Sequence, residues 1–347
     1  MESRRPDNNR SHTPETREDR PDRTFPKALA RERARPDTEA MPFAPFPETL
    51  RQNLLDWYGD QGRHWLDTLP ATLTRLAETW DLRTGGEPFT GGTTAYALPL
   101  HRSDGTPAVL KLDLLDEENR SEPTALRAYD GDGAVRLLEY DPESGAMLLE
   151  RARPGTALLE HAPPGADERT AARERLAIAC GIFRRLWRTP PPAEGHPAIP
   201  TATDLLKGWS ERFDAAAANA APEIAKDLAL GVDLCAALAD EGEIGIANRD
   251  NHLSNVIAAE REPWLLIDPK PVLAERAFDG GYFLFKQQFH GPLGGTELLR
   301  AVAEGLGADR ERVRAWGMVR TIAQIADAGT GPDLAACTEV LRAIEGA

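Results

Sequence analysis

The feature that most narrows the fold of this 347-residue chain is a switch in hydrophobic periodicity near residue 154. Before that point, strand-like patterns occupy the segments 89–102, 106–114, 134–141 and 145–152. After it, apolar residues recur at three- and four-residue spacing, as on one face of a helix. A sheet-forming half followed by a helix-forming half predicts an α+β protein with two lobes.

The strands of the first half are separated by turn signals. The sequence SDG follows the first strand and PESG follows the third, so we expect two antiparallel hairpins. Helical patterns cover 48–58 and 62–80, and Pro70 should interrupt the second or start it anew. A short helix is predicted over 121–130, with Ser121 in a position suited to capping.

Helical patterns dominate the second half of the chain, with one β-rich island that begins at 244–250 and ends at 264–269. The helices predicted there are 166–188, 203–218, 223–241, 295–307, 309–328 and 332–345.

The first 40 residues differ from the rest in composition, because they hold many charged side chains and few apolar ones. Such a segment cannot bury enough surface to offset its ordering entropy, so residues 1–40 are predicted to be a disordered extension. It also lacks the apolar run of a secretory signal. We therefore expect an N-terminal lobe over 41–152 and a helical C-terminal lobe over 153–347.

The net charge is −15, from 41 basic and 56 acidic residues. A nucleic-acid partner requires a basic face, so this balance argues against one and suits a cationic small molecule better. No segment approaches the roughly 18 apolar residues of a membrane span, so no membrane partner is expected. Cys180, Cys235 and Cys337 lie far apart and indicate reduced thiols in the cytoplasm. The oligomeric state stays open.

Three polar residues follow an order that is typical of phosphoryl transfer. Asp250 precedes Asn255 by five residues, and an apolar strand then leads to Asp268. One carboxylate on a loop can orient an attacking alcohol and accept its proton, while Mg²⁺ prefers hard oxygen ligands. The order is that of the protein-kinase-like fold, and it predicts Asp250 as the catalytic residue and Asn255 and Asp268 as Mg²⁺ ligands. An Asp near an Asn is also common in solvated turns.

Lys111 supplies the upstream support, because it lies between apolar residues in the middle of a predicted strand. A buried lysine is tolerated when an acidic partner and phosphate oxygens surround it. In kinases such a lysine holds the α and β phosphates of ATP, and a glutamate on a helix orients it. Glu122 is our first choice for that partner and Glu118 our second.

Other contacts to ATP are expected from the backbone. Gly91 and Gly92 form a turn upstream of Lys111 that could cover the phosphates, with Thr93 as a further donor, although a Gly-Gly pair is also a plain hairpin turn. The segment between the lobes would offer the main chain of Glu150 and Ala152 to adenine, although a simple strand-to-helix turn predicts the same sequence.

The acceptor should be bound by the helical lobe. Carboxylates that could face a cationic acceptor are Glu160, Asp204, Glu211 and Asp214. Four aromatic residues could line a pocket, but a core role is favoured for each; they are Trp209, Phe213, Tyr282 and Phe285. His252 is expected to make a packing or loop contact rather than to take part in the chemistry.

Several long strings resemble the aminoglycoside and hydroxyurea antibiotic-resistance kinases. Between about residue 60 and residue 285 they are GRHWLDTLP, SDGTPAVLKL, ALRAYDGDGAVRLLEYDPESGAMLLER and NVIAAEREPWLLIDPKP. The resemblance implies a protein-kinase-like fold, ATP and Mg²⁺ as cofactors, and O-phosphorylation of a small antibiotic such as a streptomycin-like aminoglycoside or hydroxyurea. It also implies that Asp279 braces the catalytic loop.

Two positions depart from the family pattern, since Asn248 replaces a usual His and Ser254 a usual Gly. ATP binding is still expected, but the acceptor stays open. A kinase of a small metabolite on the same fold, or a kinase-like protein that binds a nucleotide or partner without catalysis, are the alternatives. The presence of Lys111, Asp250 and Asp268 together with Asn255 favours an active enzyme.

Overall fold

The computed structural model describes residues 46–90, 92–190, 196–240, 242–328 and 332–347. The predicted extension over residues 1–40 therefore lies outside the described residues. We use "N-lobe" for the described residues up to 152 and "C-lobe" for those from 153 onward.

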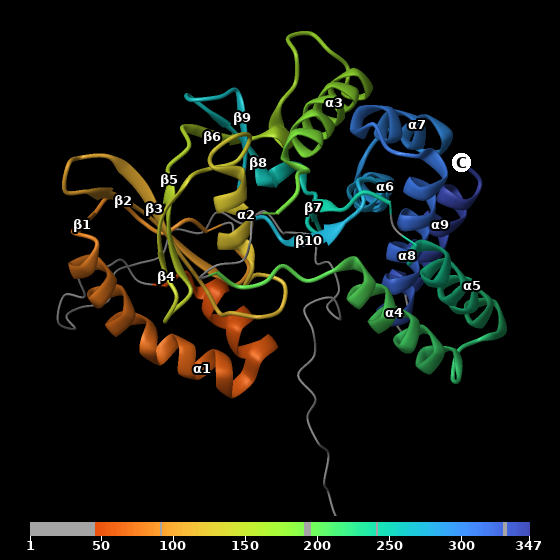
Figure 1. The fold of residues 1–347 in the computed structure, drawn as a ribbon, viewed down its shortest axis with the longest axis horizontal. Coiled ribbons are helices and arrows are strands. Elements are labelled where there is room, and N and C mark those ends of the chain that lie inside the picture. Colours follow the sequence, from red (N-terminus) through yellow and green to blue (C-terminus); the bar gives the residue numbers. More distant parts are fainter. Residues whose placement is uncertain (1–45, 91, 191–195, 241, 329–331) are drawn as a thin grey trace, which may run out of the picture.

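Alternating apolar residues build a five-stranded antiparallel sheet in the N-lobe (Figure 1). The predicted hairpins are confirmed, since β2 pairs with β3 and β4 pairs with β5. In sheet order the strands are β1 (Leu82–Thr84), β2 (Ala95–Arg102), β3 (Pro107–Asp113), β5 (Ala146–Glu150) and β4 (Leu137–Asp141).

One expectation for the first strand is wrong. The strand begins at residue 95 and not at 89, because the segment before it runs through Gly92 without regular pairing. The Phe89 N–H still donates to the Ala97 carbonyl at 2.9 Å, which folds this segment back over β2. The Gly-rich turn is therefore longer than the sequence pattern indicated.

The helix α1 (Glu48–Thr79) lies along one face of the sheet (Figure 1). Its two predicted parts meet at Gly59, where φ is +54°, a conformation that glycine adopts without steric cost. Contrary to expectation, the helix continues through Pro70. An interior proline costs about 3 kcal/mol, and the buried leucines on both sides, Leu66, Leu69, Leu73 and Leu76, pack on the sheet and offset that cost.

The other face of the sheet shares its core with the C-lobe. The short helix α2 (Glu122–Tyr129) begins after Ser121, which occupies the N-cap position without a side-chain capping hydrogen bond. Leu126 and Tyr129 of this helix join a continuous apolar cluster that extends into the C-lobe. Glu122, a predicted site residue, is the first residue of α2, so this packing fixes Glu122 relative to both lobes.

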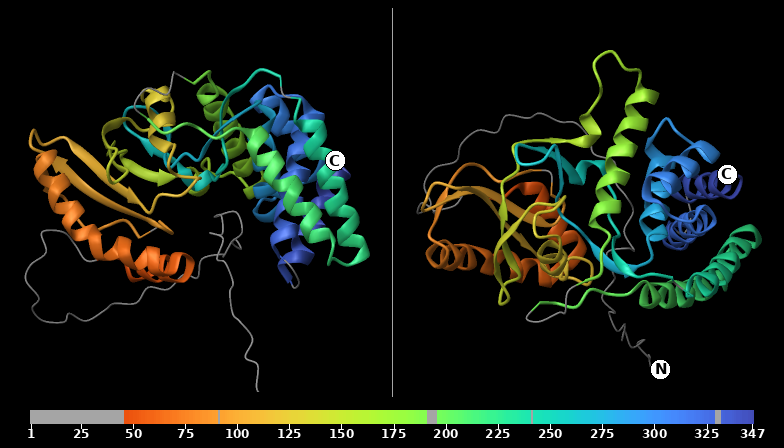
Figure 2. Two further views of the ribbon diagram at one scale, coloured as in Figure 1. Left: turned by 60° about the horizontal axis from the view of Figure 1, so that its bottom comes forward. Right: turned by 45° about the horizontal axis from the view of Figure 1, so that its top comes forward.

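The helical expectation for the C-lobe is confirmed, with ends that shift by a few residues. Most of its helices gather on the right of Figure 1, away from α1, and Figure 2 shows the same separation from two further sides. The helices are α3 (Glu168–Leu186), α4 (Ala202–Ala217), α5 (Pro222–Leu238), α7 (Gly295–Leu306), α8 (Arg310–Ala328) and α9 (Pro332–Glu345).

A further helix, α6 (Ala277–His290), runs through two glycines that lower helix propensity. The glycines allow α8 to approach closely, since a Cβ at Gly281 would lie 2.4 Å from the Cβ of Trp316. A Cβ at Gly280 would likewise lie 2.8 Å from Val313. Close packing between two helices therefore decides these residues, which local preference alone disfavours.

Short strands frame the loops between the lobes. The predicted island contains β7 (Gly245–Asn248) and β9 (Trp264–Leu266), as expected. The island also contains β8 (Val256–Ala259), which pairs with β9. Sequence reasoning missed two strands, each of four residues: β6 (Pro154–Ala157) and β10 (Pro271–Ala274). Both begin with proline, which fits the first residue of a strand. β7 pairs with β10, and β8 lies between β6 and β9.

Among the described residues, none of the helices combines the length and apolar character needed to cross a bilayer.

Arg261, in the turn between β8 and β9, ties the C-lobe to the end of β5. Its guanidinium forms a fork on Glu150, with Nε to Oε1 at 2.8 Å and Nη2 to Oε2 at 2.9 Å. It also donates to the carbonyl oxygens of Gly131 at 2.6 Å and Ala134 at 3.0 Å, and to Glu262 at 2.8 Å. All five N–H donors of the guanidinium are used, a geometry that lysine cannot reproduce.

We expect Arg261→Met to lower the free energy of unfolding by about 2–3 kcal/mol, because it removes both guanidinium hydrogen bonds from a largely buried Glu150 and leaves it the backbone N–H of Arg136. Urea denaturation measures this change. Arg63→Met is the control, since its ion pair with Asp60 is exposed and 3.9 Å long and should contribute under about 1 kcal/mol. Equal effects of the two substitutions would contradict a bracing role for Arg261.

Candidate active site

The predicted catalytic loop connects β7 with β8 and passes through a short 3-10 helix, η3 (Leu253–Asn255). Asp250 lies in this loop with its side chain 28% exposed. One carboxylate oxygen contacts His252 Nε2 at 3.0 Å, and the other accepts a hydrogen bond from Asn255 Nδ2 at 3.1 Å. The carboxylate is thus held in one orientation while part of it faces solvent.

Burial favours the protonated form of Asp250, but the hydrogen bond and charge of His252 outweigh it and lower the pKa of Asp250 to about 2. Lys286 of α6 acts in the same direction, and Asp268 acts against it. Asp250 is therefore ionised at neutral pH, ready to accept a hydrogen bond from an alcohol. The loop contact expected of His252 falls on the predicted catalytic residue itself.

Asn248 links the two loops of the site. Its Oδ1 accepts the backbone N–H of Asp250 at 3.3 Å and that of Lys270 at 2.7 Å. Its own N–H donates to Asp279 Oδ1 at 2.8 Å. An asparagine therefore supplies the acceptor that holds the catalytic loop beside the loop after β9.

Asp279 braces the catalytic loop from α6, in agreement with its expected role. Besides Asn248, it receives Asn251 Nδ2 at its backbone oxygen, at 3.0 Å. The side chain is buried, and burial raises the pKa of Asp279 to about 7. The described contacts of Asp279 are with the loop backbone and side chains, which fits a structural brace.

The Lys111 ammonium joins the two lobes electrostatically at the candidate site. It contacts Glu122 Oε2 at 2.5 Å, Asp268 Oδ1 at 2.6 Å and Asp113 Oδ2 at 3.1 Å. The structure therefore pairs Lys111 with Glu122, our first choice over Glu118. It also joins Lys111 to Asp268, which lies in the other lobe.

These charges shift one another's pKa values. Burial alone would lower the pKa of Lys111, but Asp113, Asp268 and Glu122 together raise it well above the usual value, so the ammonium stays charged. Burial also raises the pKa of Glu122 to about 7, against the attraction of Lys111. Sequence reasoning missed Asp113. Its signal was the spacing of two residues from Lys111, which puts both side chains on one face of β3.

Asp268 follows β9 and has φ of +51°, an uncommon value for a residue other than glycine.

Lys270 was also missed by sequence reasoning. Its Nζ lies 2.5 Å from Asp268 Oδ1, so Lys111 and Lys270 both donate to that one oxygen. The two lysines hold the pKa of Asp268 far below its usual range despite burial.

The residues predicted to hold Mg²⁺ have suitable chemistry for that ion. Asn255 uses its Nδ2 as a donor to Asp250, which leaves its Oδ1 as a possible oxygen ligand. The side chain of Asp268 is 33% exposed, and its Oδ2 is the oxygen that is not bonded to the two lysines. An amide oxygen and a carboxylate oxygen are hard ligands of the kind that Mg²⁺ prefers.

The residues expected to contact ATP through their backbone differ in what the structure says of them. Gly91 lies outside the described residues. The Thr93 carbonyl accepts a hydrogen bond from Asn53 Nδ2 of α1 at 2.9 Å, which anchors the turn that contains Gly92. The N–H of Glu150 donates to the Arg136 carbonyl at 2.9 Å, so that N–H is already bonded within the lobe. The prediction for adenine therefore depends more on Ala152, which follows the end of β5.

The candidate acceptor residues divide by burial. Trp209, Phe213, Tyr282 and Phe285 are all buried in the apolar core, as favoured from the sequence. Asp204 lies in the first turn of α4, which Thr201 caps: Thr201 Oγ1 accepts the Asp204 N–H at 3.1 Å and donates to Asp204 Oδ2 at 2.6 Å. The other predicted carboxylates are exposed on helices of the C-lobe; they are Glu160, Glu211 and Asp214.

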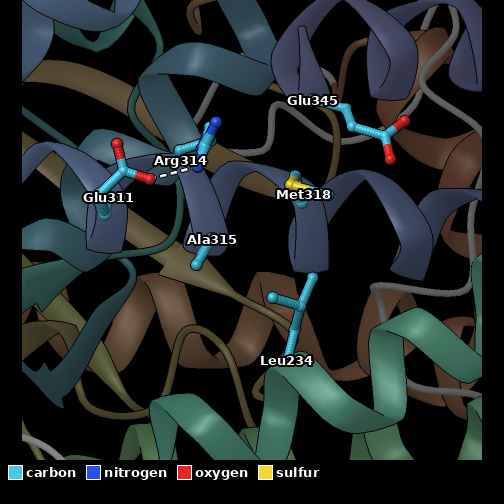
Figure 3. A pocket seen from close by; sticks show the side chains of 6 residues that line it. All are labelled: Leu234, Glu311, Arg314, Ala315, Met318 and Glu345. Atoms are coloured by element: carbon cyan, nitrogen blue, oxygen red, sulfur yellow. Dashed lines mark hydrogen bonds and ion pairs between the residues drawn. The ribbon is translucent and has the colours of Figure 1, made fainter. Parts of the chain in front are cut away.

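A separate pocket lies between α5, α8 and α9 (Figure 3). It is lined by Leu234, Glu311, Arg314, Ala315, Met318 and Glu345. None of the predicted catalytic, nucleotide or metal residues lines it, so we do not assign it to the reaction.

Comparison with known proteins agrees with this geometry. A family model for aminoglycoside/hydroxyurea antibiotic resistance kinases matches residues 79–329. A hydroxyurea phosphotransferase from Kitasatospora aureofaciens is 38% identical over 281 residues, 80% of this chain and 78% of that protein. A streptomycin 6-kinase from Streptomyces glaucescens is 33% identical over 277 residues, 78% of this chain and 86% of that protein.

Among solved structures, a choline kinase from Streptococcus pneumoniae matches with a TM-score of 0.53 at 10% identity, over 81% of this chain and 100% of that one. This likeness concerns the fold alone, and it confirms the protein-kinase-like α+β architecture. The chain belongs to the aminoglycoside/hydroxyurea antibiotic resistance kinase family, and it is a phosphotransferase.

We expect His252→Ala to raise the pKa of Asp250 from about 2 toward or above the ordinary aspartate value of about 3.9, because burial then outweighs the remaining favourable charges. A group that must be ionised loses function as pH falls through its pKa. The variant should therefore keep a smaller fraction of its pH 8 turnover at pH 5 than the wild type does.

The measurement is kcat across pH 5–8, with the exposed His64→Ala as control. Identical acid limbs for the wild type and His252→Ala would show that His252 does not control the ionisation of Asp250.

Proposed function

We propose that this kinase transfers the γ-phosphoryl group of ATP to a hydroxyl of a small antibiotic, with hydroxyurea as its first acceptor and streptomycin as its second. The observation that carries the proposal is the ion cluster that joins Lys111, Glu122 and Asp268 across the lobes, next to an ionised Asp250. This is the arrangement that phosphoryl transfer from ATP requires.

In this mechanism Asp250 accepts a hydrogen bond from the acceptor hydroxyl and orients its oxygen toward the γ-phosphorus. The new P–O bond forms as the bond to ADP breaks, and the hydroxyl proton passes to Asp250. Because the pKa of Asp250 is about 2, the carboxylate is a weak base and contributes mainly by orientation until the hydroxyl becomes strongly acidic in the transition state.

Lys111 would hold the α and β phosphates, with Glu122 fixing the direction of its side chain. The protein residues that would hold Mg²⁺ are Asn255 and Asp268. The ion, when bound, supplies positive charge that compensates the triphosphate and stabilises the leaving oxygen. Two protein ligands suit an ion that keeps several of its waters.

The choice of acceptor rests on two supports. The relative with 38% identity is a hydroxyurea phosphotransferase. His252 and Lys286 are basic groups that lower the pKa of Asp250. A polycationic acceptor would favour carboxylates near this point, whereas neutral hydroxyurea does not need them. Streptomycin stays the second acceptor because of the 33% identical streptomycin 6-kinase.

We expect Asp250→Asn to lower kcat by about 10²-fold or more, the range of general-base catalysis, while the affinity for an ATP analogue stays within about twofold. Asp268→Asn should lower both kcat and the affinity for the ATP analogue, because it removes a ligand for the metal that accompanies the nucleotide. Steady-state kinetics and calorimetry measure the two quantities. A wild-type kcat for Asp250→Asn would contradict this mechanism.

The acceptor is tested by ADP release with ATP, Mg²⁺ and one candidate at a time, with choline as a metabolite control. Hydroxyurea should raise ADP release above the acceptor-free rate, and phosphorus NMR should detect a phosphorylated product. The Asp250→Asn protein is the matched control. If choline supported turnover and neither hydroxyurea nor streptomycin did, the antibiotic assignment would be wrong.

A further inference from the structure

Lys270 is buried beside Asp268 although that carboxylate already has a lysine partner. Its relative exposure is 4%, and its Nζ lies 2.5 Å from the oxygen that Lys111 contacts at 2.6 Å. A buried lysine loses hydration and side-chain freedom, so a second ammonium on the same oxygen needs a reason beyond neutralising one carboxylate.

The backbone of Lys270 is fixed on both sides. Its N–H donates to Asn248 Oδ1 at 2.7 Å, and its carbonyl accepts the N–H of Arg249 at 2.8 Å. Pro269 and Pro271 flank it, and each proline restricts its own φ. The ammonium therefore extends from a rigid segment that is hydrogen-bonded directly to the catalytic loop.

The carboxylates around Lys111 outnumber its single positive charge, so a second cation has a role beside them. Three carboxylates, from Asp113, Glu122 and Asp268, come within 4.8 Å of one another, and Lys111 contacts all three. Lys111 is thus shared among the three, and Lys270 adds a second ion pair to Asp268. A triphosphate brings several further negative charges to the same point, and each ammonium placed there reduces the repulsion.

We propose that Lys270 is a charge-compensating residue of the phosphate site, which orients Asp268 and partly replaces the positive charge that a divalent ion must otherwise supply. This inference rests on the proposed function, because it takes Asp268 as the carboxylate beside the triphosphate. As a consequence, the nucleotide binds at a lower Mg²⁺ concentration than it would at a site that had Lys111 and Asp268 but not Lys270.

The test measures binding of AMP-PNP, a non-hydrolysable ATP analogue, by calorimetry over a series of free Mg²⁺ concentrations. We expect Lys270→Met to raise the Mg²⁺ concentration that gives half-maximal affinity by about tenfold, the size of one lost charged hydrogen bond. Lys270→Arg keeps the charge and should stay within about threefold of the wild type.

Lys207→Met is the matched control, since it removes an exposed lysine of α4 and should leave the curve unchanged. Circular dichroism checks that each variant is folded. If Lys270→Met does not fold, Lys270→Gln replaces it, because an amide can still donate to Asp268 without carrying charge.

An unshifted curve for the folded neutral variant, or equal shifts for the neutral and arginine variants, would overturn the role of Lys270. Both outcomes leave the proposed function intact, provided that the wild type binds AMP-PNP in a Mg²⁺-dependent way. Failure of the wild type to bind AMP-PNP at any Mg²⁺ concentration would overturn the proposed function and this inference with it.

Discussion

The structure depends on one buried ammonium, that of Lys111, and on the three carboxylates around it. Glu122 comes from α2 and Asp113 from the same strand, whereas Asp268 comes from the other lobe. Removing a single member of such a cluster leaves an uncompensated charge in a poorly hydrated place, which is strongly unfavourable. The cluster therefore couples the relative position of the lobes to the position of the predicted metal ligand.

A second set of contacts holds the two loops of the site together. Asn248 joins the catalytic loop to the segment that carries Lys270, and Asp279 fixes Asn248 from α6. The glycines of α6 let it pack closely against α8, so Asp279 lies on a helix that its neighbour holds in place. The side-chain amide of Asn248 acts here as an acceptor, because its Oδ1 receives the backbone N–H groups of Asp250 and Lys270.

Much of the architecture could be predicted, and the errors have physical causes. The two hairpins and most C-lobe helices follow from periodicity, because their buried faces repeat regularly. The continuation of α1 through Pro70 could not be foreseen, since packing against the sheet outweighs the local cost. The four-residue strands β6 and β10 were missed because pairing with distant partners, and not local preference, makes them strands.

The sequence by itself determined which residue types phosphoryl transfer would use, because the spacing of Asp250, Asn255 and Asp268 and the setting of Lys111 are local patterns. Only the tertiary structure decided which groups act on them. It selected Glu122 as the partner of Lys111, added Asp113 and Lys270 to the cluster, and brought His252 into contact with the carboxylate of Asp250. The physical reason is that charge interactions depend on distance and burial, and the chain brings these residues together only when both lobes have folded.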